Sequence, residues 1–220
     1  MKKLLWAAIA VLVLMLAFSA YVYNLLPETL ISHWGLENNP NGFMEKNLFF
    51  VFFICLTIAI FLLLVFLPKT DPFKKNYEAF QKEYDLLVFF FVCFMFYIFV
   101  LTILVNLGYA VNIGLGFTFA LAVLFYVIGL VLGKTKRNWF VGIRTPWSLS
   151  DDENWKKTHE LGAKLFKLLA VLIIITWLFA FFFKSLEKYI FLIVLAEILI
   201  LVFVPFFYSY ALFAEKQKRK

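Results

Sequence analysis

The sequence predicts an all-α integral membrane protein with six transmembrane helices. Hydrophobic residues make up 64% of the 220 residues and charged residues 16%, against about 45–50% and about 25% in soluble globular proteins. The mean hydropathy is +0.90, so much of the apolar surface must face lipid. This composition excludes a cytosolic enzyme, a secreted disulfide scaffold and a disordered chain.

Six apolar runs define the expected spans, because a helix needs about 20 residues to cross the bilayer core. The first, 4–26, follows Lys2 and Lys3 and is long enough to remain as an uncleaved signal anchor. The second is 48–67. No charge occurs from Leu86 to Gly133, and the turn-forming residues 106–112 divide this stretch into two spans. The last two spans are 165–183 and 189–213.

The basic residues predict that both termini are cytoplasmic. Of the 21 lysines and arginines, 18 lie in the amino terminus, the segments 68–85 and 134–167, and the carboxyl terminus. Basic residues accumulate on the cytoplasmic side of membrane proteins. The basic tail 216–220 is expected to lie against anionic headgroups of the bilayer. Direct nucleic-acid binding is not expected, since the charges have neither interleaved aromatic residues nor a folded module around them.

The segment between the first two spans, Leu26 to Lys46, is expected to be a packed outer loop that caps the bundle. Pro40-Asn41-Gly42 is a turn signal. Ile31, Trp34 and Phe43 give the loop apolar side chains for packing. His33 is either a metal ligand or a hydrogen-bonded structural histidine. We favour the structural role, because the carboxylates nearby are scattered.

The cytoplasmic segment 134–162 is expected to contain a short amphipathic helix. Ser150 followed by Glu153 resembles a capping box, and Asp151 and Asp152 suit the positive end of a helix dipole. A helix is therefore expected to begin near Asp151. It would lie along the inner surface, with Trp155, His159 and Gly162 on one face and Trp155 at the interface, and then turn into the fifth span.

Arg144 lies among aromatic residues in the irregular part of the same segment. One interpretation is an anchor to a lipid phosphate. The other is a conformational latch or docking surface in which the guanidinium makes a bidentate contact. The sequence favours neither.

Glu197 is a carboxylate within the sixth span, where a charge costs about 2.5–3.5 kcal/mol on insertion scales. Ser19, Thr57 and Thr176 lie at a similar depth in other spans. We predict a polar layer in the outer half of the bundle that hydrogen-bonds Glu197. The alternatives are a protonated side chain that ties two helices together, and a binding or proton-relay site.

The chain contains no recognisable enzyme motif, and neither a cofactor nor a metal is expected. His33 and His159 fall on opposite sides of the membrane in the predicted topology, so they do not share one site.

The cytoplasmic segment resembles the signature of the SdpI family of bacterial membrane immunity proteins. The resemblance rests on Asn138 to Ser150 (NWFVGIRTPWSLS), on Trp155-Lys156-Lys157-Thr158-His159, and on Gly162. The first two spans are similar to the domain of unknown function that often precedes this signature. The matching residues there are Leu26, Pro27, His33, Pro40 and Lys46, whereas Ile31, Ser32, Asn38 and Asn41 depart from the pattern.

The resemblance implies four parts of the chain. These are an N-terminal module (1–68), a cytoplasmic linker (69–85), a four-helix module (86–213, including 134–162) and a basic tail (214–220).

The resemblance further implies protection from a secreted, membrane-active peptide toxin in the bacterial cell membrane, with an ArsR-type repressor as a partner at the cytoplasmic face. The outer loop and outer half of the bundle would receive the toxin, and the cytoplasmic signature would act as latch or reporter. Its candidate residues are Asn138, Gly142, Arg144, Thr145, Pro146, Trp147, Trp155, Thr158 and His159. The alternatives are a sensor of another ligand, or a small transporter or membrane enzyme that uses Glu197 or His159.

Overall fold

The computed structural model describes residues 2–219, and six of its helices are long and apolar enough to cross a membrane. These helices are α1 (Lys2–Val22), α2 (Lys46–Thr70), α3 (Gln81–Asn106), α4 (Ile113–Leu132), α6 (Asp152–Phe182) and α7 (Ile190–Lys218). The prediction of a helical protein with six spans is confirmed. Shorter elements connect them: η1 (Tyr23–Leu25), η2 (Lys74–Phe80), α5 (Pro146–Ser150), η3 (Lys184–Tyr189), and the strands β1 (Thr29–Trp34) and β2 (Pro40–Glu45).

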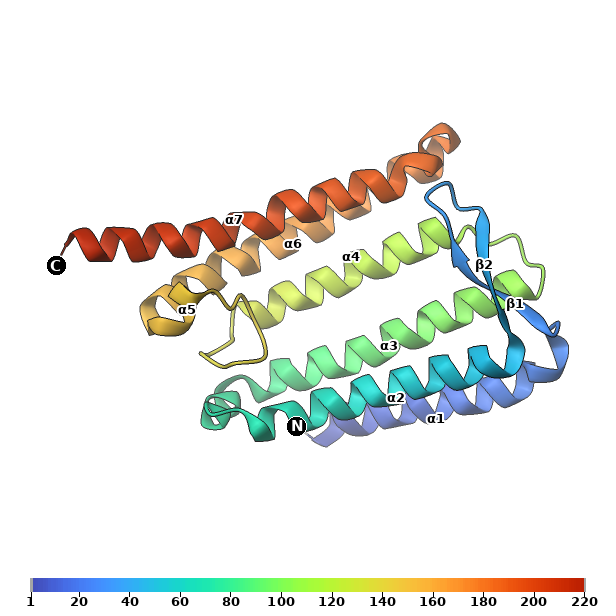
Figure 1. The fold of residues 1–220 in the computed structure, drawn as a ribbon, viewed down its shortest axis with the longest axis horizontal. Coiled ribbons are helices and arrows are strands. Elements are labelled where there is room, and N and C mark those ends of the chain that lie inside the picture. Colours follow the sequence, from blue (N-terminus) through green and yellow to red (C-terminus); the bar gives the residue numbers. More distant parts are fainter. Residues whose placement is uncertain (1, 220) are drawn as a thin grey trace.

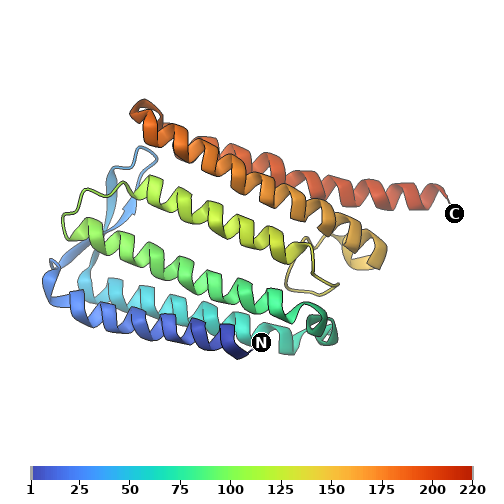
Figure 2. The same cartoon turned by 180° about the vertical axis from the view of Figure 1, so that it is seen from behind.

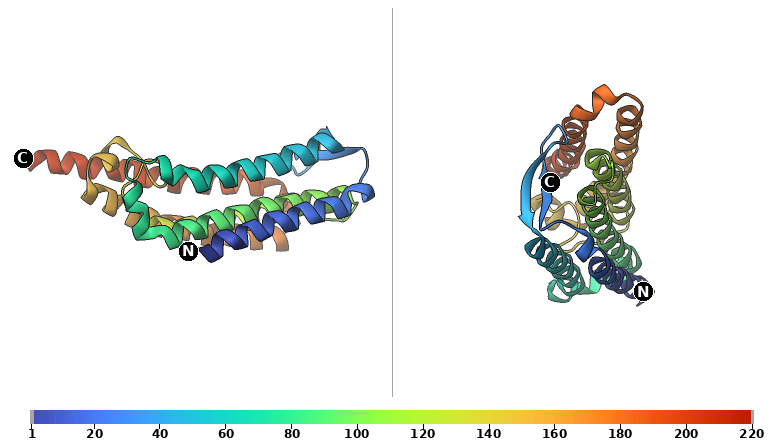
Figure 3. Two further views of the ribbon diagram at one scale, coloured as in Figure 1. Left: turned by 90° about the horizontal axis from the view of Figure 1, so that it is seen from below. Right: turned by 90° about the vertical axis from the view of Figure 1, so that its right-hand side faces the viewer.

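The helices form two layers of unequal size. Four of them make a row in the order α1, α3, α4, α6, as the contacts between neighbouring helices and the side-on views show (Figures 1 and 2). Helices α2 and α7 lie on one face of this row, α2 near α1 and α3, and α7 near α6 and α4 (Figure 3). That face of α3 and α4 is therefore flanked by a helix on each side.

The two termini lie at the same end of the bundle, together with η2 and α5 (Figure 1). We call this the inner end, because its basic residues predict that it faces the cytoplasm. The opposite end, which carries the strands, is called the outer end.

The outer segment forms a two-stranded antiparallel hairpin where the sequence predicted a packed loop. Leu30 of β1 is fully buried against Met15, Val22, Phe49 and their neighbours. The Asn106 side chain accepts a hydrogen bond from the Ile31 N–H (2.7 Å) and donates one to the Ile31 carbonyl (3.0 Å). Asn106 thus satisfies the backbone of β1 as a neighbouring strand would, and fixes the hairpin to α3.

The predicted helix start near Asp151 is confirmed, but the helix is not a short one that turns into the fifth span. Helix α6 runs without interruption from Asp152 to Phe182. The capping box is also displaced: Thr145 and Ser148 form it at the start of α5, while Asp151 caps α6 by accepting a hydrogen bond from the Glu153 N–H. Pro146 at the first position of α5 favours this earlier helix start.

Candidate functional site

Asn138 organises the inner loop between α4 and α5. Its side chain is fully buried. The amide oxygen accepts hydrogen bonds from the N–H groups of Phe140 (2.9 Å) and Val141 (2.6 Å). The amide nitrogen donates to the carbonyls of Lys136 (2.8 Å) and Val141 (2.9 Å). Only a side chain with both a donor and an acceptor makes all four bonds.

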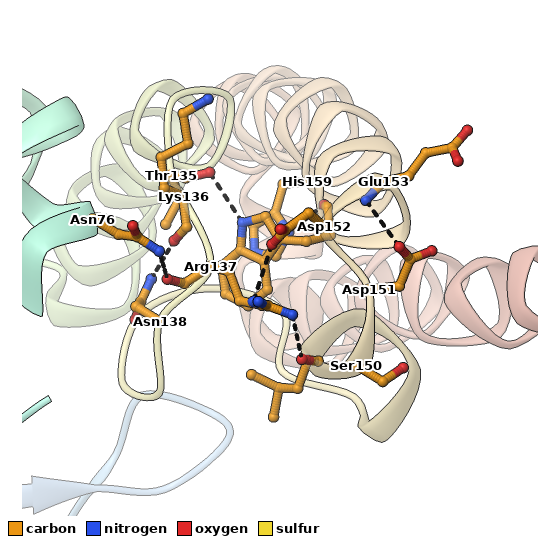
Figure 4. A network of polar contacts seen from close by, with 12 residues as sticks. Asn76, Thr135, Lys136, Arg137, Asn138, Ser150, Asp151, Asp152, Glu153 and His159 are labelled. Carbon is orange, nitrogen blue, oxygen red and sulfur yellow. Dashed lines mark hydrogen bonds and ion pairs between the residues drawn. The ribbon is translucent and has the colours of Figure 1, made fainter. Parts of the chain in front are cut away.

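Asp71 fixes the end of α2 to this loop. Its carboxylate is buried and accepts hydrogen bonds from the Phe73 N–H (2.7 Å), the Trp139 N–H (2.9 Å) and the Tyr77 hydroxyl (3.1 Å). Nearby, the Asn76 side chain donates to the Arg137 carbonyl at 2.7 Å (Figure 4). The segment 69–85 therefore packs against the family signature. This long-range role of Asp71 could not be predicted from the sequence, because an Asp before Pro indicates only a local turn.

His159 and Trp155 stack inside the inner end, with ring centroids 3.9 Å apart. The His159 Nε2 accepts a hydrogen bond from the Ile143 N–H (3.0 Å), so the ring proton is on Nδ1, which donates to the Trp155 carbonyl (2.8 Å). Trp155 donates its indole N–H to the Thr135 carbonyl at 3.0 Å (Figure 4). The expected interfacial position of Trp155 is wrong, since this side chain is 2% exposed.

The close contact between the inner loop and His159 requires a glycine at position 142. Its φ of 121° is unfavourable for a residue with a side chain. A Cβ at this position would overlap the Nε2 atom of His159. The close approach of the backbone to the imidazole explains the glycine.

Three buried polar side chains tie the signature to α7. The Thr145 and Ser209 hydroxyls share a hydrogen bond (2.9 Å), and the Asn154 side chain donates to the Ser209 carbonyl (2.8 Å). Thr158 supports Asn154 by donating to its amide oxygen (3.0 Å). Trp147 packs against the rings of Phe206 and Tyr210 on α7.

Arg144 makes one hydrogen bond, from Nη1 to the Trp139 carbonyl (2.5 Å), and its side chain is exposed. The bidentate contact expected of a latch is not formed in this state. Arg137 makes the more extensive contacts: its Nε pairs with Asp152 (3.0 Å) and its Nη1 donates to the Leu149 carbonyl (3.3 Å) (Figure 4). Sequence reasoning missed Arg137, since its partners lie in α5 and α6.

The four residues of the predicted intramembrane polar layer do not meet. Thr176 donates to Glu197 Oε1 at 2.6 Å, which joins α6 to α7. Ser19 and Thr57 donate instead to carbonyls of their own helices, Met15 and Phe53. The layer prediction is therefore wrong for these two hydroxyls, which belong to the other side of the bundle. Among residues 2–219, the buried Oε2 atom of Glu197 has no hydrogen-bond partner.

The predicted outer-loop residues form two separate groups, one around Lys46 and one within the hairpin. Lys46 is buried and pairs with Glu28 (2.9 Å), while its Nζ also lies 4.7 Å from the Tyr23 ring centroid. Pro27 is exposed beside this pair. His33 contacts the Asn41 side chain (2.5 Å) across the hairpin, and Pro40 opposes Trp34. Within the described part of the chain, no cluster of His, Cys, Asp and Glu is suited to a metal ion.

A cleft of about 550 Å³ lies beneath the hairpin, on the face flanked by α2 and α7. Its roof is formed by the tip and inner face of the hairpin, including Trp34 and Asn38. Its walls and floor come from α2, α3, α4 and α7. They are lined mostly by phenylalanine and isoleucine side chains, namely Phe49, Phe52, Phe53, Ile98, Ile113, Phe117, Ile190 and Phe191. Sequence reasoning assigned ligand binding to this outer half of the bundle without identifying the helices that enclose it.

Comparison with known proteins gives matches for both halves of the chain. Residues 134–209 match the family described as the SdpI/YfhL protein family. This segment of the chain is therefore similar to the SdpI family. Residues 10–59 match a domain of unknown function, DUF1648. The chain is 25% identical to the immunity protein SdpI of Bacillus subtilis (strain 168) over 205 residues, 92% of this chain and 93% of that protein. No solved structure matches the chain.

The similarity to a bacterial immunity protein and the six apolar helices together support a multi-pass bacterial membrane protein. The SdpI match ends at Ser209, the residue of α7 that bonds to Thr145 and Asn154. The matched region therefore includes the buried hydrogen bonds of Thr145 and Asn154 to α7.

Proposed function

We propose that this protein is a membrane immunity protein that protects the bacterial cell from a secreted, membrane-active peptide toxin by binding it. The observation that carries the proposal is the similarity to an immunity protein along 92% of the chain. The buried inner network supports it, because the residues of the family signature are used there to hold one defined conformation. The role requires no catalytic group, cofactor or metal.

A protection assay tests this function. The chain and an empty vector are expressed in a sensitive bacterium, which is then exposed to the peptide against which the B. subtilis immunity protein protects. We expect the chain to raise the tolerated peptide concentration about tenfold, equivalent to about 1.4 kcal/mol of effective binding. Membrane levels are matched by immunoblot, and no protection at matched levels would refute the proposal.

A second proposed activity is signalling through an ArsR-type repressor at the inner end. It is favoured by a surface that the buried network presents to the cytoplasm: Trp139 is 55% exposed, and Arg144 and Pro146 are also exposed. The end of α7, with Lys216 and Lys218, projects beyond the other helices (Figure 1). Such signalling requires the toxin to bind one of two conformations more tightly.

Membrane capture of the repressor tests the signalling proposal. We expect repressor to sediment with membranes that contain the chain only when the peptide is present. Trp139→Ala should abolish capture while protection is retained. Capture that is independent of the peptide, or unaffected by this substitution, would contradict the proposed surface.

The transporter or membrane-enzyme alternative receives less support. Both ring nitrogens of His159 are hydrogen-bonded to the backbone. Glu197 retains one oxygen without a partner in the described structure. A proton-dependent flux in proteoliposomes that is lost in Glu197→Gln would favour the transporter, whereas immunity predicts no such flux.

A further inference from the structure

The cleft under the hairpin extends from the apolar helices to the hairpin that lies beyond their ends. Thr102 and Ile98 on its floor lie about one to two helical turns below the outer end of α3, as their separation from Asn106 shows. Trp34 and Asn38 in its roof belong to the hairpin, outside the membrane-spanning helices. An occupant must therefore be apolar along its deeper part and polar at its upper end.

The size and lining of the cleft are those of a ligand site. A volume of about 550 Å³ falls within the roughly 300–1,000 Å³ of small-ligand pockets, which are mostly apolar with a few placed polar groups. Large apolar side chains at its edge remain exposed, including Phe52 (52%) and Phe191 (46%). Exposed aromatic residues around an apolar groove are typical of surfaces that receive a helix through several side-chain anchors.

Hydrogen bonds within the chain hold the elements around the cleft together. The Asn38 side chain accepts a hydrogen bond from the Gly114 N–H (2.9 Å), so the hairpin tip is attached to the start of α4. The Asn112 side chain donates to Glu187 (2.8 Å), which attaches the same helix start to η3. The roof and one wall are thus joined through α4, and a preformed site reduces the entropy lost on binding.

The charge at the rim of the cleft favours a cationic occupant over an anionic one. The structure describes all residues that line the cleft. With His33 taken as neutral, Glu187 is the one lining residue that carries a formal charge. Its carboxylate repels the phosphate of a phospholipid headgroup and attracts an ammonium or guanidinium group. The rim is therefore complementary to a cationic peptide end.

We propose that this cleft binds the apolar face of a membrane-inserted helical peptide, with a lysine, arginine or amino terminus of that peptide beside Glu187. This inference rests on the proposed function and identifies where and how the toxin is held. Apolar side chains of the peptide fill the space between α2 and α7, and its cationic end meets the rim at the level of the hairpin.

Photo-crosslinking tests the site directly. A photoreactive phenylalanine analogue is placed at Phe52, in the cleft, or at Leu63, which is 56% exposed on the same helix and does not line the cleft. The probe is the peptide used in the protection assay, added to membranes that contain the chain. We expect an adduct with the peptide at Phe52 and none at Leu63. Lipid adducts alone at both positions would overturn the proposal.

Paired substitutions measure the contribution of the site to protection. Phe191→Ala removes a cleft side chain, whereas Phe207→Ala removes an exposed ring from the same helix outside the cleft. Glu187→Gln removes the rim charge, and Glu37→Gln is its match in the hairpin turn, an exposed carboxylate that does not itself line the cleft. We expect Phe191→Ala and Glu187→Gln each to lower the tolerated peptide concentration about tenfold, as for a binding hot spot. Their matched controls should protect like the wild type, and equal effects within each pair would overturn the proposal.

The two readouts separate this inference from the proposed function. Protection by the wild type without a Phe52 adduct leaves immunity standing and refutes the cleft. An adduct at Phe52 without protection supports the cleft as a peptide site and refutes immunity. The absence of both refutes both.

Discussion

The inner and outer ends of this bundle satisfy the hydrogen-bonding groups of their connecting segments in different ways. At the inner end, Asn138, Asp71 and His159 use their side chains to satisfy the backbone of one irregular loop. At the outer end, Asn106 and Asn38 make the few polar contacts that hold the hairpin, and an apolar cleft stays open beneath it. The inner end is thus held by many buried hydrogen bonds, whereas the outer end combines few such bonds with an accessible apolar cleft, which is where we propose that a peptide binds.

The two glycines with positive φ provide the strongest test of this contrast. Gly142 has φ 121° and Gly108 has φ 88°, so alanine costs about 1–2 kcal/mol of backbone strain at either site. At Gly142 the new Cβ would also overlap His159, whereas nothing lies within 4 Å at Gly108. We expect Gly142→Ala to lower the free energy of unfolding by more than about 3 kcal/mol and Gly108→Ala by only the strain. Equal losses in an SDS titration would contradict a closely packed inner end.

Asp71→Ala should have the next largest effect. The substitution leaves the N–H groups of Phe73 and Trp139 without their acceptor. The Tyr77 hydroxyl loses its bond to Asp71 but can still donate to the Asn138 amide oxygen (3.1 Å). The expected loss is about 3 kcal/mol, because each buried unsatisfied donor costs about 1–3 kcal/mol. Asp71→Asn keeps one acceptor oxygen and should lose less, as measured in the same titration. A stable Asp71→Ala protein would show that the contact between η2 and the signature loop is dispensable.

The two arginines of the signature region should respond differently to lysine. Arg137→Lys cannot preserve both the ion pair with Asp152 and the bond to Leu149, and should cost about 1 kcal/mol of stability. Arg144→Lys should change stability by less than about 0.5 kcal/mol, as expected for an exposed side chain. Loss of protection in a stable Arg144→Lys protein would instead assign Arg144 to a functional contact with a partner or lipid.

The smallest expected effect is a pH dependence at the start of α6. The hydrogen bond from the Lys216 side chain lowers the pKa of Asp151, and the bond from the Glu153 backbone acts in the same direction. A lowered carboxyl pKa stabilises the fold at pH values above the ordinary carboxyl pKa of about 3.9. This contribution is lost as the pH falls through the lowered pKa.

Asp151→Asn isolates that contribution, since asparagine still caps the helix. We expect it to reduce stability at pH 7 by no more than about 1 kcal/mol, because the ion pair is largely exposed. The difference from the wild type should disappear in acid. Lys216→Met should reproduce this behaviour, and a difference that persists below the pH at which Asp151 becomes protonated would show that the ion pair is not its source.

Predictions were more accurate for features that depend on one continuous run of residues than for features that depend on contacts between distant residues. The six spans could be predicted because each depends on the composition of one continuous run. The capping box was assigned to Ser150 and Glu153, but forms at Thr145 and Ser148, where Pro146 favours an earlier start. Trp155 was expected at the interface, because helical spacing identifies a shared face without revealing what covers it.

The sequence by itself determined the apolar helices, the resemblance to the SdpI family and the residues that carry this resemblance, since hydropathy and motifs are local properties. The tertiary structure alone decided which atoms those residues bond and where a ligand space remains. Asp71 reaches Trp139 across 68 positions of the chain, and Asn106 reaches Ile31 across 75. The cleft likewise forms because α2 and α7 lie apart on one face of the row. Such placements depend on how complete helices pack, and no local pattern encodes them.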